Sequence, residues 1–480
     1  MAHRLDPLLK PRSIAFVGAS PRAGTVGNGM LLEIKRSGYK GRVFAVNPKY
    51  AEVEGYPCYP SIEALPEAPD LAVLAVANAR LEAEFEKALH TGAKSAAIFA
   101  SGYLENDRTP PLTERLRARA RAAAIPLCGG NCMGFYNYED GVYVCGFPAS
   151  PKVRKGGITF ITHSGSIMAA LVDSEERLGF NFVVSSGQEL ASTAGEYMDY
   201  ALERPSTRLI ALFLETVREP ERFIAALEKA RAREVPVVAL KVGRTPLSAK
   251  LVESHSGALA GNDAAYQALF DRYGVMRVST IDEMAAVCLL FSQERRVAPG
   301  GIASIHDSGG ERANVIDLAS DVGVPFAAIG EATVARLKER LEYGLEPTNP
   351  LDAWGTGHDH EAVFTDCFSA MVNDPASALG LFFTDRHDGG VLPRHYARIC
   401  LKVRARTAKP IALVLHRPGS GGDPYDRELI EAGVPVIDGD RNALTAARLA
   451  FEYRDFLARP RCQAPAAPSA ALIARWRGRL

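Results

Sequence analysis

The sequence predicts an α/β protein of three consecutive domains, each built on a largely parallel sheet. Its 480 residues are enough for about three domains at roughly 150 residues each. From residue 13 onward, short runs rich in β-branched residues alternate with segments whose apolar residues recur at helical spacing. Glycine-rich turns follow several of these runs. Strand, turn and helix in this order are typical of doubly wound folds, which bind ligands at the carboxyl ends of their strands.

The charge balance argues against a polyanionic partner such as nucleic acid. Lysine and arginine together number 56, and aspartate and glutamate also number 56, so the formal net charge is zero. No segment approaches the roughly 20 apolar residues of a membrane-spanning helix, and residues 1–13 lack the apolar core of a signal peptide. The eight cysteines follow neither a disulfide nor a zinc pattern, which favours reduced thiols and a cytoplasmic protein.

The first domain, placed at residues 1–150, opens with a nucleotide-binding pattern. Residues 13–20 predict a strand that ends in a glycine turn, 28–39 predict an amphipathic helix closed by Gly38, and 42–50 predict the second strand. An NAD site would need GxGxxG and an acidic residue after the second strand. Here Gly18-Ala19-Ser20 interrupts that pattern and Lys49 supplies a cation. A phosphorylated adenosine therefore fits better than NAD.

The second domain, placed at residues 151–297, carries a predicted anion site. Residues 156–162 predict a strand, Ser164 an N-cap, and 165–178 a helix that stops at Gly179. The free N–H groups at the start of that helix favour an anion. A further strand, 208–214, ends on Glu215, and the loop 185–189 also follows a strand.

One histidine of this domain stands in an unusual setting, SHSGALAG at residues 254–261. We expect a strand at 235–243, a loop around His255 and a helix at 262–274. Small residues on both sides of His255 allow backbone N–H groups to approach a group bound to the imidazole. A lone loop histidine is more often an ordinary surface residue, so the spacing by itself does not decide its role.

A charged linker near residues 293–301 leads into the third domain, placed at 298–460. The order of strand, glycine loop and helix recurs from residue 301, with later strands at 378–384, 409–416 and 434–438. This is a flavodoxin-like pattern. His358 and His360 lack a third ligand in sequence, so we predict no metal site. Residues 461–480 read as a linker or tail.

The octet SHSGALAG, followed by Tyr266, Phe270 and Tyr273-Gly274-Val275, resembles the phosphohistidine segment of the NDP-forming acyl-CoA synthetases. These ADP-forming acetate–CoA ligases are relatives of succinyl-CoA synthetase. The resemblance extends through VGAS, NPKY, IFASGY and GNCMGFYN to nearly the whole chain. It implies a Rossmann-like CoA-binding domain followed by two flavodoxin-like ligase domains.

The resemblance also implies roles for individual residues. His255 would carry the phosphoryl group, and Glu215 would hydrogen-bond its imidazole and make it more nucleophilic. Phosphate ligands would be Ser164, Gly165, Ser256 and Gly257. CoA contacts would be Gly18, Ser20, Val26, Lys49, Val76, Ser101 and Asn131. The chain departs from the family pattern at Ala77 and Gly130, where proline is usual, and at His163, where glutamine or arginine is commoner.

The expected function is therefore the CoA-binding and phosphohistidine-carrying subunit, or a fragment, of an acyl-CoA synthetase that interconverts acyl-CoA, phosphate and ADP with carboxylic acid, CoA and ATP. Residues 1–480 contain no GxxxxGK[ST] P-loop and no ATP-grasp segment. ADP or ATP and Mg²⁺ would then bind to an ATP-grasp partner subunit or a missing fused domain, in an oligomer. A non-catalytic CoA or acyl-CoA sensor is the alternative, and a dehydrogenase is disfavoured by Lys49.

Overall fold

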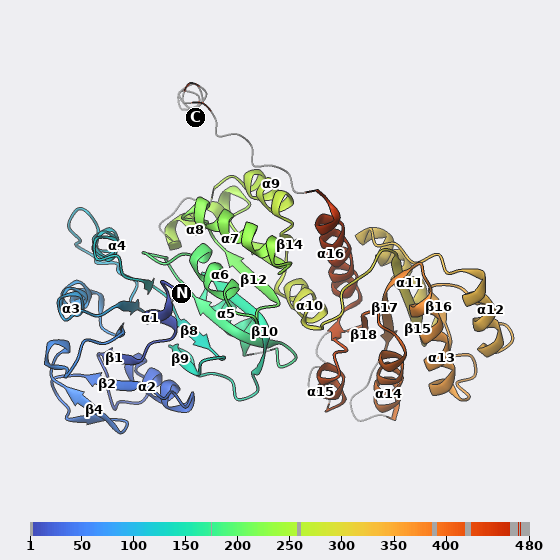
Figure 1. The fold of residues 1–480 in the computed structure, drawn as a ribbon, viewed down its shortest axis with the longest axis horizontal. Helices are drawn as coiled ribbons and strands as arrows, with labels where there is room; N and C mark the ends of the chain where they lie inside the picture. Colours follow the sequence, from blue (N-terminus) through green and yellow to red (C-terminus); the bar gives the residue numbers. More distant parts are fainter. Residues whose placement is uncertain are drawn as a thin grey trace.

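The computed structural model describes residues 3–173, 175–256, 261–385, 391–417 and 424–460, together with Ser469 and Ala471. Three sheet domains follow one another along the longest axis of the molecule (Figure 1). Helices cover the faces of the sheets, and the central strands are buried on both faces, as expected for parallel sheets rich in Val, Ile, Leu and Ala.

The first sheet has the strand order β3-β4-β2-β1-β5-β6-β7. Its six parallel strands, from β4 to β7, have the 3-2-1-4-5-6 order of a Rossmann fold, with a switch point between β1 and β5. The Rossmann-like prediction for this domain is confirmed. The strands are β1 (Ser13–Val17), β2 (Arg42–Val46), β3 (Glu52–Val53), β4 (Tyr56–Tyr59), β5 (Leu71–Leu74), β6 (Ser95–Ile98) and β7 (Leu127–Gly129). The helices are α1 (Asp6–Leu9), α2 (Val26–Arg36), α3 (Asn78–His90) and α4 (Leu112–Ala122).

The second sheet has the order β14-β13-β12-β10-β11-β8-β9. Its strands are β8 (Gly134–Asn137), β9 (Val142–Cys145), β10 (Arg154–Thr162), β11 (Gly179–Ser185), β12 (Leu209–Leu214), β13 (Val237–Lys241) and β14 (Met276–Val278). Its helices are α5 (Gly165–Val172), α6 (Ala194–Leu202), α7 (Pro220–Ala232), α8 (Pro246–Ser256), α9 (Asp263–Tyr273) and α10 (Ile281–Ser292). Because β8 and β9 are antiparallel edge strands of this sheet, residues 134–145 belong to it structurally, although they precede the predicted boundary at 150.

The third sheet is parallel, with the order β16-β15-β17-β18-β19, a 2-1-3-4-5 arrangement. Its strands are β15 (Gly301–His306), β16 (Leu351–Asp352), β17 (Ser377–Thr384), β18 (Ile411–Leu415) and β19 (Val436–Asp438). Its helices are α11 (Gly309–Val322), α12 (Glu331–Arg340), α13 (His360–Asn373), α14 (Val391–Arg406), α15 (Pro424–Glu431) and α16 (Asp440–Ala458). The flavodoxin-like prediction for this domain is confirmed.

The second and third domains share one hydrophobic core. Helices α10 and α16 lie between the two sheets and pack against each other (Figure 1). Arg177, which precedes β11, donates a hydrogen bond to the carbonyl oxygen of Val436 (3.2 Å) and pairs with Asp438 (3.0 Å). This buried guanidinium ties the amino end of the second sheet to the carboxyl end of the third.

Two sequence expectations for the second domain need correction. The segment before the small residues of SHSGALAG is not a loop, because α8 continues through His255 to Ser256. Helix α5 is also shorter than predicted and ends at Val172 instead of near Leu178. Within the described residues, none of the helices combines the length and the apolar character needed to cross a membrane.

Candidate active site

The predicted CoA residues of the first domain lie mostly along one edge of the first sheet. Five of them follow the carboxyl ends of five of the six parallel strands: Gly18 after β1, Lys49 after β2, Val76 after β5, Ser101 after β6 and Asn131 after β7. Ser20 and Val26 stand in the turn between β1 and α2 and at the start of α2. The residues thus occupy the crevice where doubly wound sheets bind ligands.

Gly18 shows why the turn after β1 needs glycine. Its φ is +93°, and a Cβ placed there would lie 2.3 Å from the carbonyl oxygen of Ala75. A Cβ on Gly27 would likewise lie 2.3 Å from the carbonyl oxygen of Gly18. The turn therefore packs directly against both β5 and α2, and no side chain at Gly18 blocks the approach of a ligand to this backbone.

The loop 185–189 of the second domain joins the first domain at this edge. The backbone N–H of Gln188 donates to the carbonyl oxygen of Gly130 (2.8 Å), and its side-chain Nε2 donates to the carbonyl oxygen of Ser101 (3.0 Å). Leu190 adds a bond from its N–H to the carbonyl oxygen of Gly129 (2.7 Å). The predicted CoA residues after β6 and β7 are thus held by the same loop that follows β11.

The other end of that loop meets the predicted phosphate site. Strand β10 lies between β11 and β12, with Thr162 in register with Ser185 on one side and Phe213 on the other. His163, Glu189 and Glu215 therefore project from one sheet edge, and all three are buried, with exposed fractions of 3%, 2% and 7%. The sequence reasoning predicted Glu215 here but gave Glu189 no role.

His163 is hydrogen-bonded through Nδ1, and its Nε2 lies close to a carboxylate without hydrogen-bond geometry. Its Nδ1 accepts the backbone N–H of Glu215 (3.0 Å), and its Nε2 lies 3.1 Å from Oε1 of Glu189. An Nδ1 that accepts a hydrogen bond carries no proton, so the ring proton resides on Nε2 and faces the Glu189 carboxylate. The arrangement leaves His163 no free lone pair for nucleophilic attack.

Helix α5 begins at this edge with a complete N-cap. Oγ of Ser164 accepts the N–H of Ile167 (3.4 Å), and Oγ1 of Thr162 accepts the N–H of Ser164 (3.0 Å). A Cβ on Gly165 would lie 2.1 Å from Cγ of Met133, so glycine is required for the helix to start here. Ser164 and Gly165 thus place the positive end of α5 beside Glu215.

Lys241 is a buried cation at the same edge that the sequence reasoning missed. It ends β13, is 3% exposed, and its Nζ lies 4.4 Å from the ring centre of Tyr266. Burial lowers its pKa to about 8, although the Asp263 and Glu215 carboxylates act in the opposite direction. In the sequence, a lysine at the end of an otherwise apolar strand was the signal that could have identified this residue.

The backbone of His255 and Ser256 forms the end of α8. The side chains of residues 254–260 and the whole of Gly257 lie outside the described structure, so the predicted contacts of His255, Ser256 and Gly257 stay predictions.

A second polar cluster lies at the carboxyl edge of the third sheet. Nδ1 of His416 lies 2.9 Å from a carboxylate oxygen of Asp440, and its Nε2 lies 2.9 Å from Oε2 of Glu311. Asp307 joins them, so that one ligand atom from each of Asp307, Glu311 and His416 falls within a 4.8 Å group. Burial opposes protonation of His416, but the hydrogen bond and charge of Asp440 outweigh it and raise its pKa to about 9. A protonated His416 between two carboxylates is a closed ion triad.

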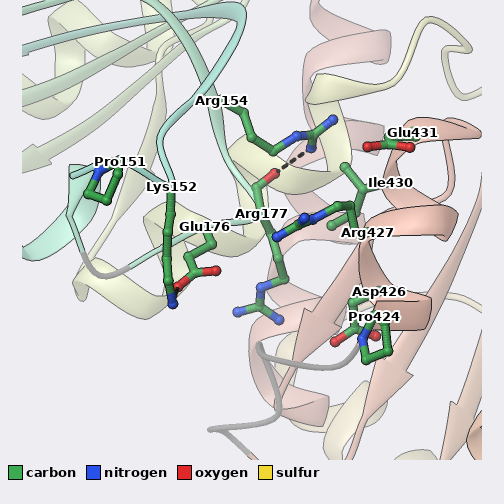
Figure 2. A pocket seen from close by; sticks show the side chains of 10 residues that line it. All are labelled: Pro151, Lys152, Arg154, Glu176, Arg177, Pro424, Asp426, Arg427, Ile430 and Glu431. Carbon is green, nitrogen blue, oxygen red and sulfur yellow. Dashed lines mark hydrogen bonds and ion pairs between the residues drawn. The ribbon is translucent and has the colours of Figure 1, made fainter. Parts of the chain in front are cut away.

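A cavity of about 510 Å³ lies between the second and third domains on the side of Arg177. Figure 2 shows Lys152, Arg154 and Glu176 reaching it from the second domain, and Arg427 and Glu431 from α15. Lys152 pairs with Glu176, and Arg177 pairs with Glu175 and Asp438. None of the predicted site residues that the structure describes lines this cavity, so it is separate from the edge that holds Glu215.

Comparisons with known proteins agree with this layout. Residues 12–138 match the CoA binding domain family, and residues 155–291 match the succinyl-CoA ligase like flavodoxin domain family. The chain is 32% identical over 354 residues to ADP-forming acetate–CoA ligase I of Archaeoglobus fulgidus, covering 73% of this chain and 51% of that relative. It therefore spans about half the length of that relative.

Two further matches extend over almost the whole chain. The alpha subunit of ADP-forming acetate–CoA ligase II from Pyrococcus furiosus is 29% identical, over 92% of this chain and 96% of its own length. The structure of acetyl-coenzyme A synthetase 1 from Ca. Korarchaeum cryptofilum superposes with a TM-score of 0.84 at 22% identity, covering 95% of this chain and 97% of that one, which shows a shared fold. The chain belongs to the family of the ADP-forming acyl-CoA synthetases, the acetate–CoA ligases.

Proposed function

We propose that this chain is the CoA-binding and phosphohistidine-carrying part of an ADP-forming acyl-CoA synthetase. The observation that carries the proposal is the loop 185–189, whose hydrogen bonds join Ser101 and Gly130 of the CoA edge to the edge with Ser164 and Glu215. A thioester held on the first domain would thereby be presented to the start of α5. The relatives named above are CoA ligases, which favours this function over a non-catalytic CoA sensor.

The proposed reaction has three balanced steps. Inorganic phosphate attacks the acyl-CoA carbonyl, the carbon–sulfur bond breaks, and CoA thiol and acyl phosphate form. The imidazole of His255 then attacks the phosphorus of the acyl phosphate, which releases the carboxylate. Finally the phosphoryl group passes from His255 to ADP and gives ATP. Reversal of the three steps makes acyl-CoA from acid, CoA and ATP.

The second domain would supply positioning and charge. Phosphoryl transfer depends chiefly on alignment and on stabilisation of the oxygens that carry charge. Ser164 caps α5, and the first-turn N–H groups that begin at Gly165 favour a phosphoryl group at the start of this helix. Glu215 would accept a proton from the His255 imidazole, fix its tautomer and leave its other nitrogen free to attack.

The nucleotide step would need a partner. We assign ADP or ATP, together with Mg²⁺, to an ATP-grasp subunit or domain, because the matched relative is an alpha subunit and the sequence has no P-loop. Helix α8 offers a contact surface next to His255, since Leu247 is 72% exposed and Leu251, one turn later, 64% exposed.

The need for an ATP-grasp partner can be tested directly. We expect the purified chain to bind CoA but not to form acyl-CoA from acid, CoA and ATP, and we expect an added ATP-grasp subunit to restore turnover. Thioester formation is measured with and without that subunit, and CoA and NADH binding by calorimetry. Full activity of the isolated chain would refute the division of labour. NADH binding without CoA binding would refute the whole assignment.

A further inference from the structure

A second interdomain cavity, of about 310 Å³, lies where α10, the following linker and α16 meet. These segments lie side by side between the second and third sheets (Figure 1). Its apolar walls include Leu290, Phe291, Ala450 and Leu457. The volume is within the range of small-molecule sites, and such sites favour domain interfaces. Among the described residues, none of those assigned above to CoA or phosphate lines it.

Two buried polar side chains line this cavity without a hydrogen bond in the described structure. Gln293 is 3% exposed, and neither its Oε1 nor its Nε2 has a partner. Tyr453 is 6% exposed, and its hydroxyl also lacks a partner. Burial of unpaired polar atoms destabilises a fold, and folded proteins leave few of them. A carboxamide with both ends unpaired calls for a ligand that offers a donor beside an acceptor.

The lining is also positive. It includes Arg295, Arg296 and Arg454 but one carboxylate, that of Glu234. Arg296 donates to the carbonyl oxygen of Gln293 (2.8 Å). Arg454 donates to the carbonyl oxygen of Ala298 (2.7 Å) and also pairs with Asp455 (2.7 Å), which leaves Arg296 as the better phosphate ligand. Guanidinium groups held in this way recognise phosphate well.

We propose that this cavity binds an adenine nucleotide, with the monophosphate as the simplest form. Glutamine pairs with the N6 donor and N7 acceptor of adenine through two parallel hydrogen bonds, which would satisfy both ends of Gln293. The apolar walls would receive the faces of the purine, and an arginine would receive the phosphate. Guanine presents O6 and N7, two acceptors, on the same edge, so it would leave one end of the carboxamide mismatched.

Because the site lies between two domains, binding there would affect how these domains are arranged. A ligand seated between α10 and α16 stabilises the arrangement of the second and third domains in which the cavity exists, since binding to one state shifts the population toward it. The site is thus regulatory in character and independent of the proposed CoA and phosphohistidine chemistry.

Calorimetry of the full chain with AMP, in saturating CoA, tests the proposal. CoA excludes AMP from the first domain, so the remaining binding reports on the cavity. We expect AMP to bind and to raise Tm, and GMP and ribose 5-phosphate to bind at least about 10-fold more weakly. Gln293→Leu should weaken AMP binding by about 10-fold or more, whereas Gln267→Leu, on the exposed face of α9, should not.

Tyr453→Phe provides a second probe that preserves the packing of the ring. AMP binding that disappears in saturating CoA, equal binding of GMP, or unchanged AMP affinity in folded Gln293→Leu would each overturn the proposal. CoA binding by Gln293→Leu serves as the folding control, and it also keeps a failure here distinct from a failure of the proposed function.

Discussion

Nδ1 of His163 accepts the backbone N–H of Glu215 over 3.0 Å, and this bond crosses from the end of β10 to the end of β12. It fixes the backbone from which the Glu215 carboxylate projects. It also occupies the histidine that stands in the first of the two HSG sequences of the chain. A buried imidazole thus supports the backbone at Glu215.

Glu215→Gln should slow phosphorylation of His255 by roughly 100-fold or more, because the amide is a weaker proton acceptor than the carboxylate. CoA affinity should stay the same, since Glu215 lies on the second domain. Rapid-quench labelling with phosphate and acetyl-CoA measures the rate, and calorimetry measures CoA binding. Normal labelling kinetics in the variant would show that Glu215 has no role in the phosphorylation of His255.

Gly18→Ala should abolish or strongly weaken CoA binding. The new Cβ would meet the carbonyl oxygen of Ala75 at 2.3 Å, at a φ of +93° that costs about 1–3 kcal/mol by itself. Gly29→Ala is the matched control, because it lies inside α2 and its Cβ would meet nothing within 4 Å. That variant should bind CoA normally and gain up to about 1 kcal/mol of stability. Equal CoA affinity in the two variants would contradict the placement of the site.

His416 should make stability fall as pH rises. Its pKa is about 9 in the folded state against 6.5 as the ordinary value, so its contribution is complete below pH 6.5 and is lost as pH passes 9. Solvent screening limits the contribution to roughly 1–3 kcal/mol. Glu311, with a pKa of about 6, stays ionised in most of this window.

The free energy of unfolding in urea is measured for the wild type and for His416→Gln at pH 6.5 and at pH 9.5. The difference between the two proteins at each pH gives the contribution of His416. Lys241 titrates in the same range with the opposite sign, because its pKa is lowered to about 8, but it is common to both proteins and cancels. A difference that does not shrink at the higher pH would show that His416 is not protonated between Asp440 and Glu311.

Much of the layout of the predicted site was predictable because the carboxyl ends of parallel strands lie at one edge of a sheet. Gly18, Lys49, Ser101 and Asn131 lie far apart in sequence, yet each follows a strand, so their common edge follows from the fold. Ser164 was recognisable as an N-cap from the residues around it, and the structure confirms it. The ligand roles of these residues stay predictions.

Other features depend on contacts that local patterns do not encode. Nothing near β8 and β9 indicates that β8 pairs with β11 of the next domain and that β9 extends the same sheet. The neighbours of His163 come from the segments that follow two other strands, β12 and β11. Helix α8 escaped notice because Leu247 and Leu251 are exposed, so its apolar residues do not mark a buried face, although Pro246 at its start was an available signal.

The central claim is that His255, and not His163, carries the phosphoryl group. The direct measurement is labelling of the chain with radioactive phosphate in the presence of acetyl-CoA, followed by peptide mapping at alkaline pH, where phosphohistidine survives. We predict label on the peptide with His255, its loss in His255→Ala, and its persistence at a lower rate in His163→Asn. Label that persists in His255→Ala and vanishes in His163→Asn would contradict the account.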